Sequence, residues 1–262
     1  MKLTFFKYHG TGNDFILIDA RNGNFKPEKS LIERMCHRRF GIGADGLITL
    51  NNARGFDFEM KYYNADGNES TMCGNGGRCI VAFADFLSPE GRPYRFIAVD
   101  GVHTASILEK DNDHYSVEIS MNDVAEIRKQ GSDLILDTGS PHFVRFVKDV
   151  DNIDVKQEGR FIRDGVEFRP GGINVNFVED KGDRIYVRTY ERGVEDETLS
   201  CGTGVTASAL AYASLKGIKE GMINIITRGG ALKLHFMTSG KTFTGIRLVG
   251  PAKKTFNGVV EL

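Results

Sequence analysis

Apolar and polar residues alternate in short runs along most of this chain, which is the pattern of half-buried strands. Such runs in the first half predict strands over residues 3–8, 15–19, 47–50, 58–63, 94–99, 104–109 and 115–119. A helix is predicted over residues 31–40, with Ser30 as its N-cap and Gly41 just past its end. Strands followed by isolated helices are typical of an α+β fold.

The second half repeats this order. A strand, a Thr-Gly turn and a second strand follow one another over residues 134–144, as they do near the N-terminus. A helix is predicted over residues 155–163. The remaining runs predict strands over residues 173–178, 184–190, 223–227, 232–236 and 243–249.

Two matching segments, which we call the cysteine packages, carry the strongest signal. One runs from Cys73 through Gly74, Asn75 and Gly76 into an apolar stretch, and the other runs from Cys201 through Gly-Thr-Gly into a second one. Each predicts a thiol at the start of a helix. The first backbone N–H groups of a helix have no partner inside it, so they bind an anion, and the helix dipole favours a thiolate there.

The duplication implies two similar domains, each with one helix start and one thiol. Polar residues over 123–132 place a domain boundary, so we expect an N-terminal domain over residues 1–122 and a C-terminal domain over 123–254. Residues 255–262 are expected to return to the first domain.

Composition narrows the functional classes. Lysine and arginine number 34 against 35 aspartates and glutamates, a balance that favours neither nucleic acid nor an anionic membrane surface. No apolar run approaches the roughly 20 residues of a membrane-spanning helix, and the N-terminus does not read as a secretory signal. We therefore expect a cytoplasmic enzyme with reduced cysteines. Cys73 and Cys79 are too widely spaced for a zinc knuckle, so no metal is expected.

Two thiols suit one reaction in particular. Inverting a Cα centre requires removing a proton from one face and delivering one to the other, which two positioned groups achieve without moving. The developing negative charge would be stabilised by the N–H groups at the helix starts. No lysine motif for pyridoxal phosphate is evident, so no cofactor is expected.

The chain resembles the diaminopimelate epimerase family. The resemblance is carried by residues 9–15, by 64–67 with the package at 72–79, and by 190–193 with the package at 201–204. It implies cofactor-independent interconversion of LL- and meso-diaminopimelate, in lysine and peptidoglycan precursor synthesis. It also implies two pseudo-symmetric α+β domains, each a curled sheet wrapped around a central helix, usually in a homodimer.

The resemblance also implies residue roles. Cys73 would accept the proton from the LL substrate and Cys201 would donate one, with His142 beside the reacting centre and Glu191 accepting from the substrate ammonium. Arg192 suits a distal carboxylate because its planar fork can pair with both oxygens. The other expected substrate-binding residues are Asn13, Gly46, Asn64, Gly74, Asn75, Ser140, Asn174, Gly202 and Thr203.

Three features depart from the family pattern. Ser140 stands where the family often has Asn, and Gly46 stands where many members have a Gln that touches substrate. The stretch from Glu191 to Cys201 is one residue longer than expected. Cys36 and Cys79 lie in apolar helical patterns and are interpreted as core residues.

Other functional classes remain open at this point. A proline-type racemase of the same fold would also use two thiols, but the pair Glu191–Arg192 favours a substrate with a second charged end. A thiol redox protein would form a reversible disulfide during turnover, although the chain lacks a C-x-x-C motif. A non-catalytic binding protein could also have anion-binding N–H groups at the two helix starts.

Overall fold

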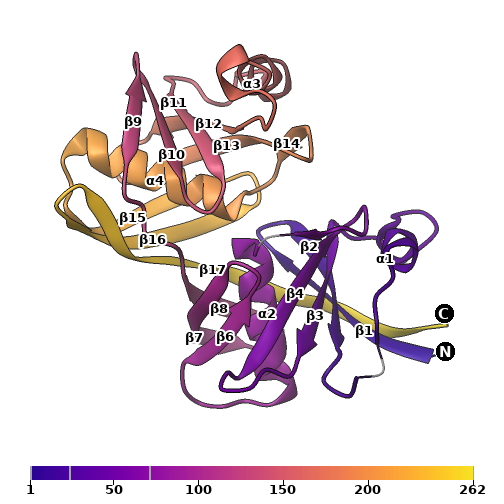
Figure 1. The fold of residues 1–262 in the computed structure, drawn as a ribbon. Helices are drawn as coiled ribbons and strands as arrows, with labels where there is room; N and C mark the ends of the chain where they lie inside the picture. Colours follow the sequence, from indigo (N-terminus) through magenta and orange to yellow (C-terminus); the bar gives the residue numbers. More distant parts are fainter. Residues whose placement is uncertain (1, 24, 71, 262) are drawn as a thin grey trace. The chain divides into compact units, whose positions relative to one another are not determined.

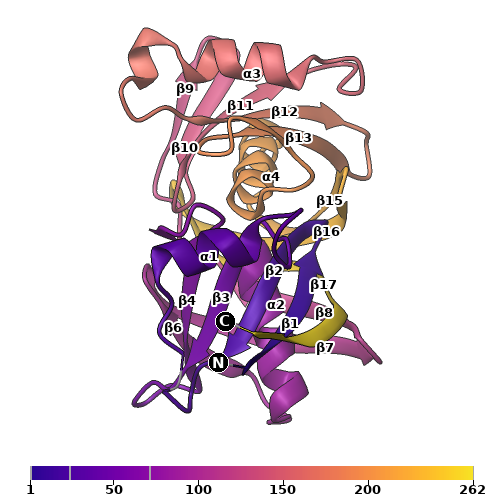
Figure 2. The same cartoon turned by 90° about the vertical axis from the view of Figure 1, so that its right-hand side faces the viewer.

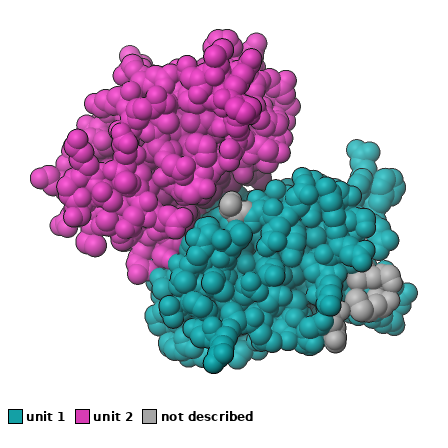
Figure 3. All heavy atoms as spheres, in the orientation of Figure 1, with its two compact units in different colours: residues 1–119, 250–262 teal, residues 120–249 magenta. Residues whose placement is uncertain are grey.

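The computed structural model describes residues 2–23, 25–70 and 72–261. The chain forms two compact units, one comprising Met1–Ile119 with Gly250–Leu262 and the other Ser120–Val249 (Figure 3). The sequence placed these boundaries after residues 122 and 254. The chain rejoins the first unit already at Gly250, because from that residue onward it pairs with the strand that contains Val117. Leu262, the last residue of the expected return, lies outside the described residues.

The first unit is built mainly from strands. Its strands are β1(Lys2–Gly10), β2(Asn13–Asp19), β3(Gly46–Asn51), β4(Phe58–Asn64), β5(Glu69–Ser70), β6(Tyr94–Ala98), β7(Gly101–Asp111), β8(His114–Ser120) and the second part of β17(Thr242–Glu261). They pair in the order β17, β1, β2, β3, β4, β6, β7, β8 and back to β17, so the sheet closes into a ring. Only β2–β3 and β4–β6 are parallel.

Helix α2(Gly74–Leu87) fills this ring (Figure 1). It packs against strands β1, β2, β3, β4 and β7, and twelve of its residues, from Gly74 to Asp85, are buried. The apolar run from Cys79 to Ala84 is buried by this enclosure, which is the usual place of such a run in a globular domain. Cys79 lies inside it, fully buried, in agreement with the prediction that it is a core residue.

The second unit repeats this plan. Its strands are β9(Ile127–Gln130), β10(Asp133–Asp137), β11(Pro141–Phe146), β12(Asn174–Asp180), β13(Ile185–Glu191), β14(Asp196–Thr198), β15(Glu220–Thr227), β16(Gly230–Ser239) and the first part of β17. They pair in the order β9, β10, β11, β12, β13, β15, β16, β17, again with two parallel pairs, β11–β12 and β13–β15. A single bridge between Val124 and Phe243 links the two ends of this order.

Helix α4(Gly202–Lys216) occupies the centre of the second unit (Figure 2). Its buried residues are mostly small, among them Ala207, Ser208 and Ala209, so the surrounding strands can approach its backbone closely. Helix α3(Val155–Arg163) and the short helix η1(Val166–Phe168) lie in the connection between β11 and β12. The prediction of two similar α+β domains, each a mixed sheet curled around a central helix, is confirmed.

One predicted helix ends elsewhere. Helix α1(Lys29–Cys36) stops before residue 40, and its N-cap is Glu28 rather than Ser30. Its end is determined by the following loop, in which the N–H groups of Ile42 and Gly43 both donate to the carbonyl oxygen of Met35. Cys36, at the end of the helix, is buried as predicted.

The last strand is longer than the sequence indicated. The strand predicted over residues 243–249 and the described part of the segment predicted to return over residues 255–262 belong to the single strand β17(Thr242–Glu261). Neither unit contains a described helix that is long and apolar enough to cross a membrane.

Candidate functional site

The first cysteine package lies at the start of α2, as predicted. Cys73 is the N-cap residue, with extended backbone (φ −91°, ψ 127°), and its carbonyl oxygen accepts from the N–H of Gly77 at 2.7 Å. A Cβ on Gly77 would lie 2.5 Å from the Cδ1 atom of Ile119 in β8 and 3.0 Å from the sulfur of Met72, so a larger residue here would require these side chains to shift. The thiol therefore sits beside the N–H groups of the first helical turn, which favour an anion.

A chain of hydrogen bonds fixes the side chains around Cys73. Arg78 Nη2 donates to Asn75 Oδ1 at 2.8 Å, Asn75 Nδ2 donates to Asn13 Oδ1 at 3.3 Å, and Asn13 Nδ2 donates to Asp45 Oδ2 at 2.7 Å. A guanidinium only donates and a carboxylate only accepts, so both amide orientations are determined. Asn13 consequently presents its oxygen to Cys73 Sγ, at 3.5 Å.

Charged residues fix Asp45, at the end of this series of hydrogen bonds. Arg38 donates to both Asp14 and Asp45, and Lys7 donates to Asp14 and to the carbonyl oxygen of Gly43. Burial raises the pKa of Asp14, but the hydrogen bonds from Arg38 and Lys7 outweigh it and lower the pKa to about 2. Asp14 is therefore ionised at neutral pH, and together with Arg38 it fixes Asp45.

Two other predicted residues of the first unit, Gly46 and Asn64, lie near the same edge of its sheet. Gly46 begins β3, where it pairs with Asn64 at the end of β4 and with Phe15 of β2, two residues after Asn13. A Cβ on Gly46 would lie 2.5 Å from the ring of Tyr62. It would also lie 2.5 Å from the backbone carbonyl oxygen of Tyr63, so a larger residue at this position would require both the ring and the β4 backbone to move.

The second cysteine package repeats this geometry. Cys201 is the N-cap of α4 (φ −112°, ψ 118°) and is buried, and its carbonyl oxygen accepts from the N–H of Val205. Cys201 Sγ lies 3.4 Å from Thr203 Oγ1, a hydroxyl that can donate or accept. Thr138, in the turn equivalent to that before Asn13, donates from Oγ1 to the carbonyl oxygen of Thr203 at 3.0 Å.

Ser140, Asn174 and Arg192 form one hydrogen-bonded cluster in the second unit. Asn174 Nδ2 donates to Ser140 Oγ at 2.9 Å, and the backbone N–H of Arg192 donates to Asn174 Oδ1 at 2.9 Å. Arg192 also donates from Nη2 to Ser140 Oγ at 3.3 Å and from Nη1 to the carbonyl oxygen of Gly171 at 3.3 Å. Ser140 thus contacts two other predicted residues directly, although it replaces the family's Asn. Glu191, half-buried, ends the neighbouring strand β13.

His142 is fully buried in β11, where it pairs with Asn174 of β12. Burial, together with the positive charge of Arg192, lowers the pKa of His142 to about 3. The imidazole is therefore neutral throughout the physiological range. Asn176 Nδ2 lies 3.1 Å from His142 Nδ1.

The sequence did not predict Asp45, Arg78 or Asn176 as part of either cluster. A usable signal existed for Asn176, because it stands two residues after Asn174 in a buried strand and so shares its face. Asp45 and Arg78 stand in the glycine loop before β3 and inside α2, where nothing local distinguishes them from ordinary polar residues.

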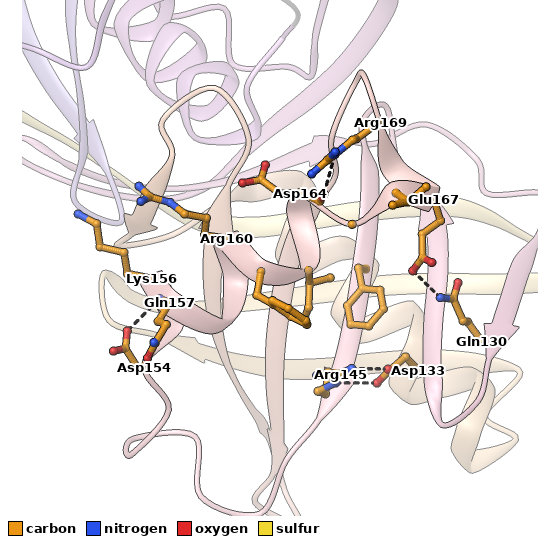
Figure 4. A pocket seen from close by; sticks show the side chains of 15 residues that line it. Gln130, Asp133, Arg145, Asp154, Lys156, Gln157, Arg160, Asp164, Glu167 and Arg169 are labelled. Carbon is orange, nitrogen blue, oxygen red and sulfur yellow. Dashed lines mark hydrogen bonds and ion pairs between the residues drawn. The ribbon is translucent and has the colours of Figure 1, made fainter.

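A hollow in the second unit lies away from these residues (Figure 4). It has a volume of about 940 Å³ and is lined by residues of α3, η1 and neighbouring strands, including Arg145, Phe161 and Val166. None of the predicted site residues lines it. Several of its polar side chains are hydrogen-bonded to one another, as Arg145 is to Asp133 and Gln130 is to Glu167, and no cysteine lines it.

Each unit, described by itself, therefore combines a cysteine at a helix start with oriented polar side chains. This arrangement can hold a carboxylate and exchange a proton with a carbon acid next to it. Among the residues that the structure describes, no group of three or more His, Cys, Asp or Glu side chains could hold a metal ion.

Comparison with known proteins identifies close relatives. The profile of the family described as diaminopimelate epimerase matches residues 5–127 and 134–255. The diaminopimelate epimerase of Flavobacterium psychrophilum is 48% identical over 262 residues, covering 99% of this chain and 100% of its own length. That of Chlorobaculum tepidum is 41% identical, covering 97% of this chain and 99% of its own length.

Solved structures with the same fold are more distant in sequence. A phenazine biosynthesis protein of the PhzF family from Bacillus anthracis superimposes with a TM-score of 0.79 at 12% identity, covering 100% of both chains. A hydroxyproline epimerase from Agrobacterium vitis superimposes with a TM-score of 0.72 at 14% identity, covering 99% of this chain and 91% of that one. At such identities the likeness shows the fold alone.

Proposed function

The chain belongs to the diaminopimelate epimerase family and is an isomerase, and on this premise we propose that it converts LL-diaminopimelate to meso-diaminopimelate with two cysteines as acid and base. The observation that carries the proposal is the repetition of one arrangement, in which Cys73 and Cys201 each form the N-cap of the helix enclosed by their unit. Two equivalent thiols suit a reaction that moves one proton off a carbon and another onto it.

In the proposed mechanism, Cys73 as thiolate removes the Cα proton of the LL centre, and the thiol of Cys201 delivers a proton to the opposite face. The two groups exchange roles in the reverse direction. The mechanism requires both sulfurs to reach one carbon atom when substrate is bound. Proton transfer by positioned groups of this kind contributes about 10²- to 10⁴-fold to a rate.

The carbanion formed in this step places charge on the α-carboxylate. We propose that the backbone N–H groups of Gly74, Asn75, Gly202 and Thr203 bind this carboxylate. Donors held in place before the reaction stabilise such charge without reorganising, and losing one typically costs about 10²- to 10³-fold in kcat. The glycines at these helix starts carry no side chain that would cover the neighbouring N–H groups.

The distal end of the substrate carries a second ammonium and carboxylate. We propose that Arg192 pairs with the distal carboxylate and that Ser140, Asn174, Asn13, Asn64 and Gly46 contribute polar contacts. Arg192 is exposed, and its guanidinium and backbone N–H both bond within the cluster that contains Asn174, which supports a fixed orientation. Glu191 would accept from the substrate ammonium, and His142 would lie beside the reacting centre.

We also propose, from the family resemblance, that the enzyme works as a homodimer in the cytoplasm, in lysine and peptidoglycan precursor synthesis. Sedimentation velocity would test the assembly. A single species at twice the mass of 29.0 kDa is expected, whereas a monomer at micromolar concentration would contradict it.

The deciding experiment is incubation with LL-diaminopimelate in D₂O. Solvent deuterium should enter at one Cα as the meso isomer forms, and both Cys73→Ala and Cys201→Ala should abolish epimerisation. Cys36→Ala serves as the matched control, because that buried thiol lies in α1 and should leave epimerisation nearly intact. Retained activity in either helix-start variant, or dependence on a reversible disulfide, would refute the mechanism.

A substrate series tests the proposed distal contacts. Amino acids that lack the distal ammonium and carboxylate should not be turned over at comparable rates. Equal turnover of short amino acids with a single centre would instead favour a racemase of the same fold.

A further inference from the structure

The side-chain amide of Asn176 has a determined orientation. Its Nδ2 lies 3.0 Å from the backbone carbonyl oxygen of Phe143, an atom that can only accept. Its Oδ1 accepts from Thr189 Oγ1 at 2.9 Å. Rotating the amide by 180° would bring Oδ1 against the carbonyl oxygen of Phe143, so this contact selects the orientation. The Thr189 hydroxyl, which can donate or accept, is compatible with it.

This orientation determines the tautomer of His142. One hydrogen of the Asn176 amide goes to Phe143, and the other points at His142 Nδ1, 3.1 Å away. Nδ1 must therefore accept, and in a neutral imidazole the proton then resides on Nε2. Burial keeps the ring neutral, since it lowers the pKa of His142 to about 3.

The Nε2–H of His142 is buried and has no hydrogen-bond partner among residues 2–23, 25–70 and 72–261. Leaving such a donor unpaired costs about 1–3 kcal/mol, so an unpaired one invites a ligand acceptor. The surroundings belong to the second cysteine package. A Cβ on Gly204 would lie 2.5 Å from Asn176 Oδ1 and 3.2 Å from Cys201 Cβ, so the amide packs against the first turn of α4.

We propose that Asn176 and Thr189 are positioning residues that hold His142 as an Nε2–H donor, so that His142 donates a hydrogen bond to an anionic oxygen of the ligand and does not act as a proton acceptor. The identity of that oxygen, a carboxylate of diaminopimelate, rests on the proposed function. The tautomer itself does not.

Nitrogen NMR of the free enzyme, labelled with ¹⁵N at its six histidines, tests the tautomer directly. The signals that disappear in His142→Gln identify this residue. The expected pattern is a protonated Nε2 and an unprotonated Nδ1, unchanged between pH 5 and 9. A proton on Nδ1, or titration of the ring within this range, would overturn the proposal.

Two variants test the positioning role. Asn176→Asp offers Nδ1 only an acceptor, so the proton should move to Nδ1 or the ring should become doubly protonated. Thr189→Val removes the donor to Asn176 Oδ1, and loss of one hydrogen bond in the support should lower kcat about tenfold, with a smaller change in KM. Thr189→Ser keeps the hydroxyl and should keep kcat close to that of the parent enzyme.

The NMR, the variants and the D₂O experiment together distinguish failure of the positioning role from failure of the proposed epimerase function. If the tautomer is as expected but Thr189→Val and Asn176→Asp turn over at the wild-type rate, the positioning role is wrong and the epimerase assignment stands. If the D₂O experiment fails while Nε2 carries the proton, the epimerase assignment is wrong and the positioning of His142 stands. Should Asn176→Asp not fold, the comparison of Thr189→Val with Thr189→Ser decides alone.

Discussion

Replacing Gly204 with alanine tests how tightly the second cysteine package is built. Gly204 lies in the first turn of α4, and the added Cβ would meet Asn176 Oδ1 at 2.5 Å, Cys201 Cβ at 3.2 Å and Thr189 Oγ1 at 3.3 Å. The first distance is shorter than real Cβ contacts, so something must move. The side chain of Asn176 cannot move easily, because its amide is hydrogen-bonded to His142, Phe143 and Thr189.

The magnitude follows from two opposing effects. Overpacking of a well-packed interior costs about 1–3 kcal/mol. Alanine stabilises a helix interior by up to about 1 kcal/mol relative to glycine, and less in the first turn. We therefore expect Gly204→Ala to lower the free energy of unfolding by about 1–2 kcal/mol, and displacement of Asn176 should also lower kcat.

Urea denaturation followed by circular dichroism measures the first effect, and the epimerisation assay measures the second. Gly171→Ala is the matched control, because a Cβ there meets no described atom within 4 Å, and it should change the unfolding free energy by less than about 0.5 kcal/mol. If Gly204→Ala proved as stable and as active as the parent, the packing argument would be refuted.

Three further predictions address other parts of the structure. Arg188→Met should destabilise the protein by about 3–5 kcal/mol in denaturant titrations, because the buried guanidinium donates to three backbone carbonyl oxygens and to a carboxylate. Arg184→Met, at the surface, is the control and should change the free energy of unfolding by less than about 0.5 kcal/mol. The folded-state pKa of Asp14, about 2, lies below its ordinary value of 3.8, so the stability it confers is complete above pH 4 and is lost as the pH falls towards 2. The ionised Asp14 contributes about 2 kcal/mol to the free energy of unfolding. Asp14→Asn should therefore flatten the curve of unfolding free energy against pH between pH 4 and 2. An unchanged slope would contradict the pairing of Asp14 with Arg38 and Lys7. Asp45→Ala removes the acceptor that orients Asn13 and should lower kcat/KM about tenfold with little loss of stability, so equal kinetics would show that the amide needs no such support.

The parts of the fold that sequence reasoning predicted correctly depend on local signals. Helix α3 has the predicted bounds because Asp154 caps it, accepting from the N–H of Gln157, and apolar residues recur on one face. Helix α1 was predicted too long because its end depends on the loop that returns to Met35. The continuation of β17 past Val249 depends on a partner strand more than a hundred residues away, which no local pattern contains.

The candidate site likewise contains residues that local sequence signals predict and residues that they do not. Cys73 and Cys201 could be predicted because each is followed directly by glycines and a helix, and the structure places both at helix starts. The residues that orient their neighbours could not, since Asp45 meets Asn13 across 32 positions and Asn176 meets His142 across 34. Such pairs arise only when the sheet brings distant strands into register.

The shared strand β17 has a consequence for how the protein can be made. Its first part lies in the sheet of the second unit, and residues from Gly250 onward pair with both β8 and β1 in the first. The first unit therefore cannot close its ring until residues 250–261, which follow the whole second unit in the chain, have been synthesised. Until then β1 and β8 are unpaired strand edges of the kind that pair with other chains. Removing the pairing residues 250–261 should therefore impair the first unit before the second.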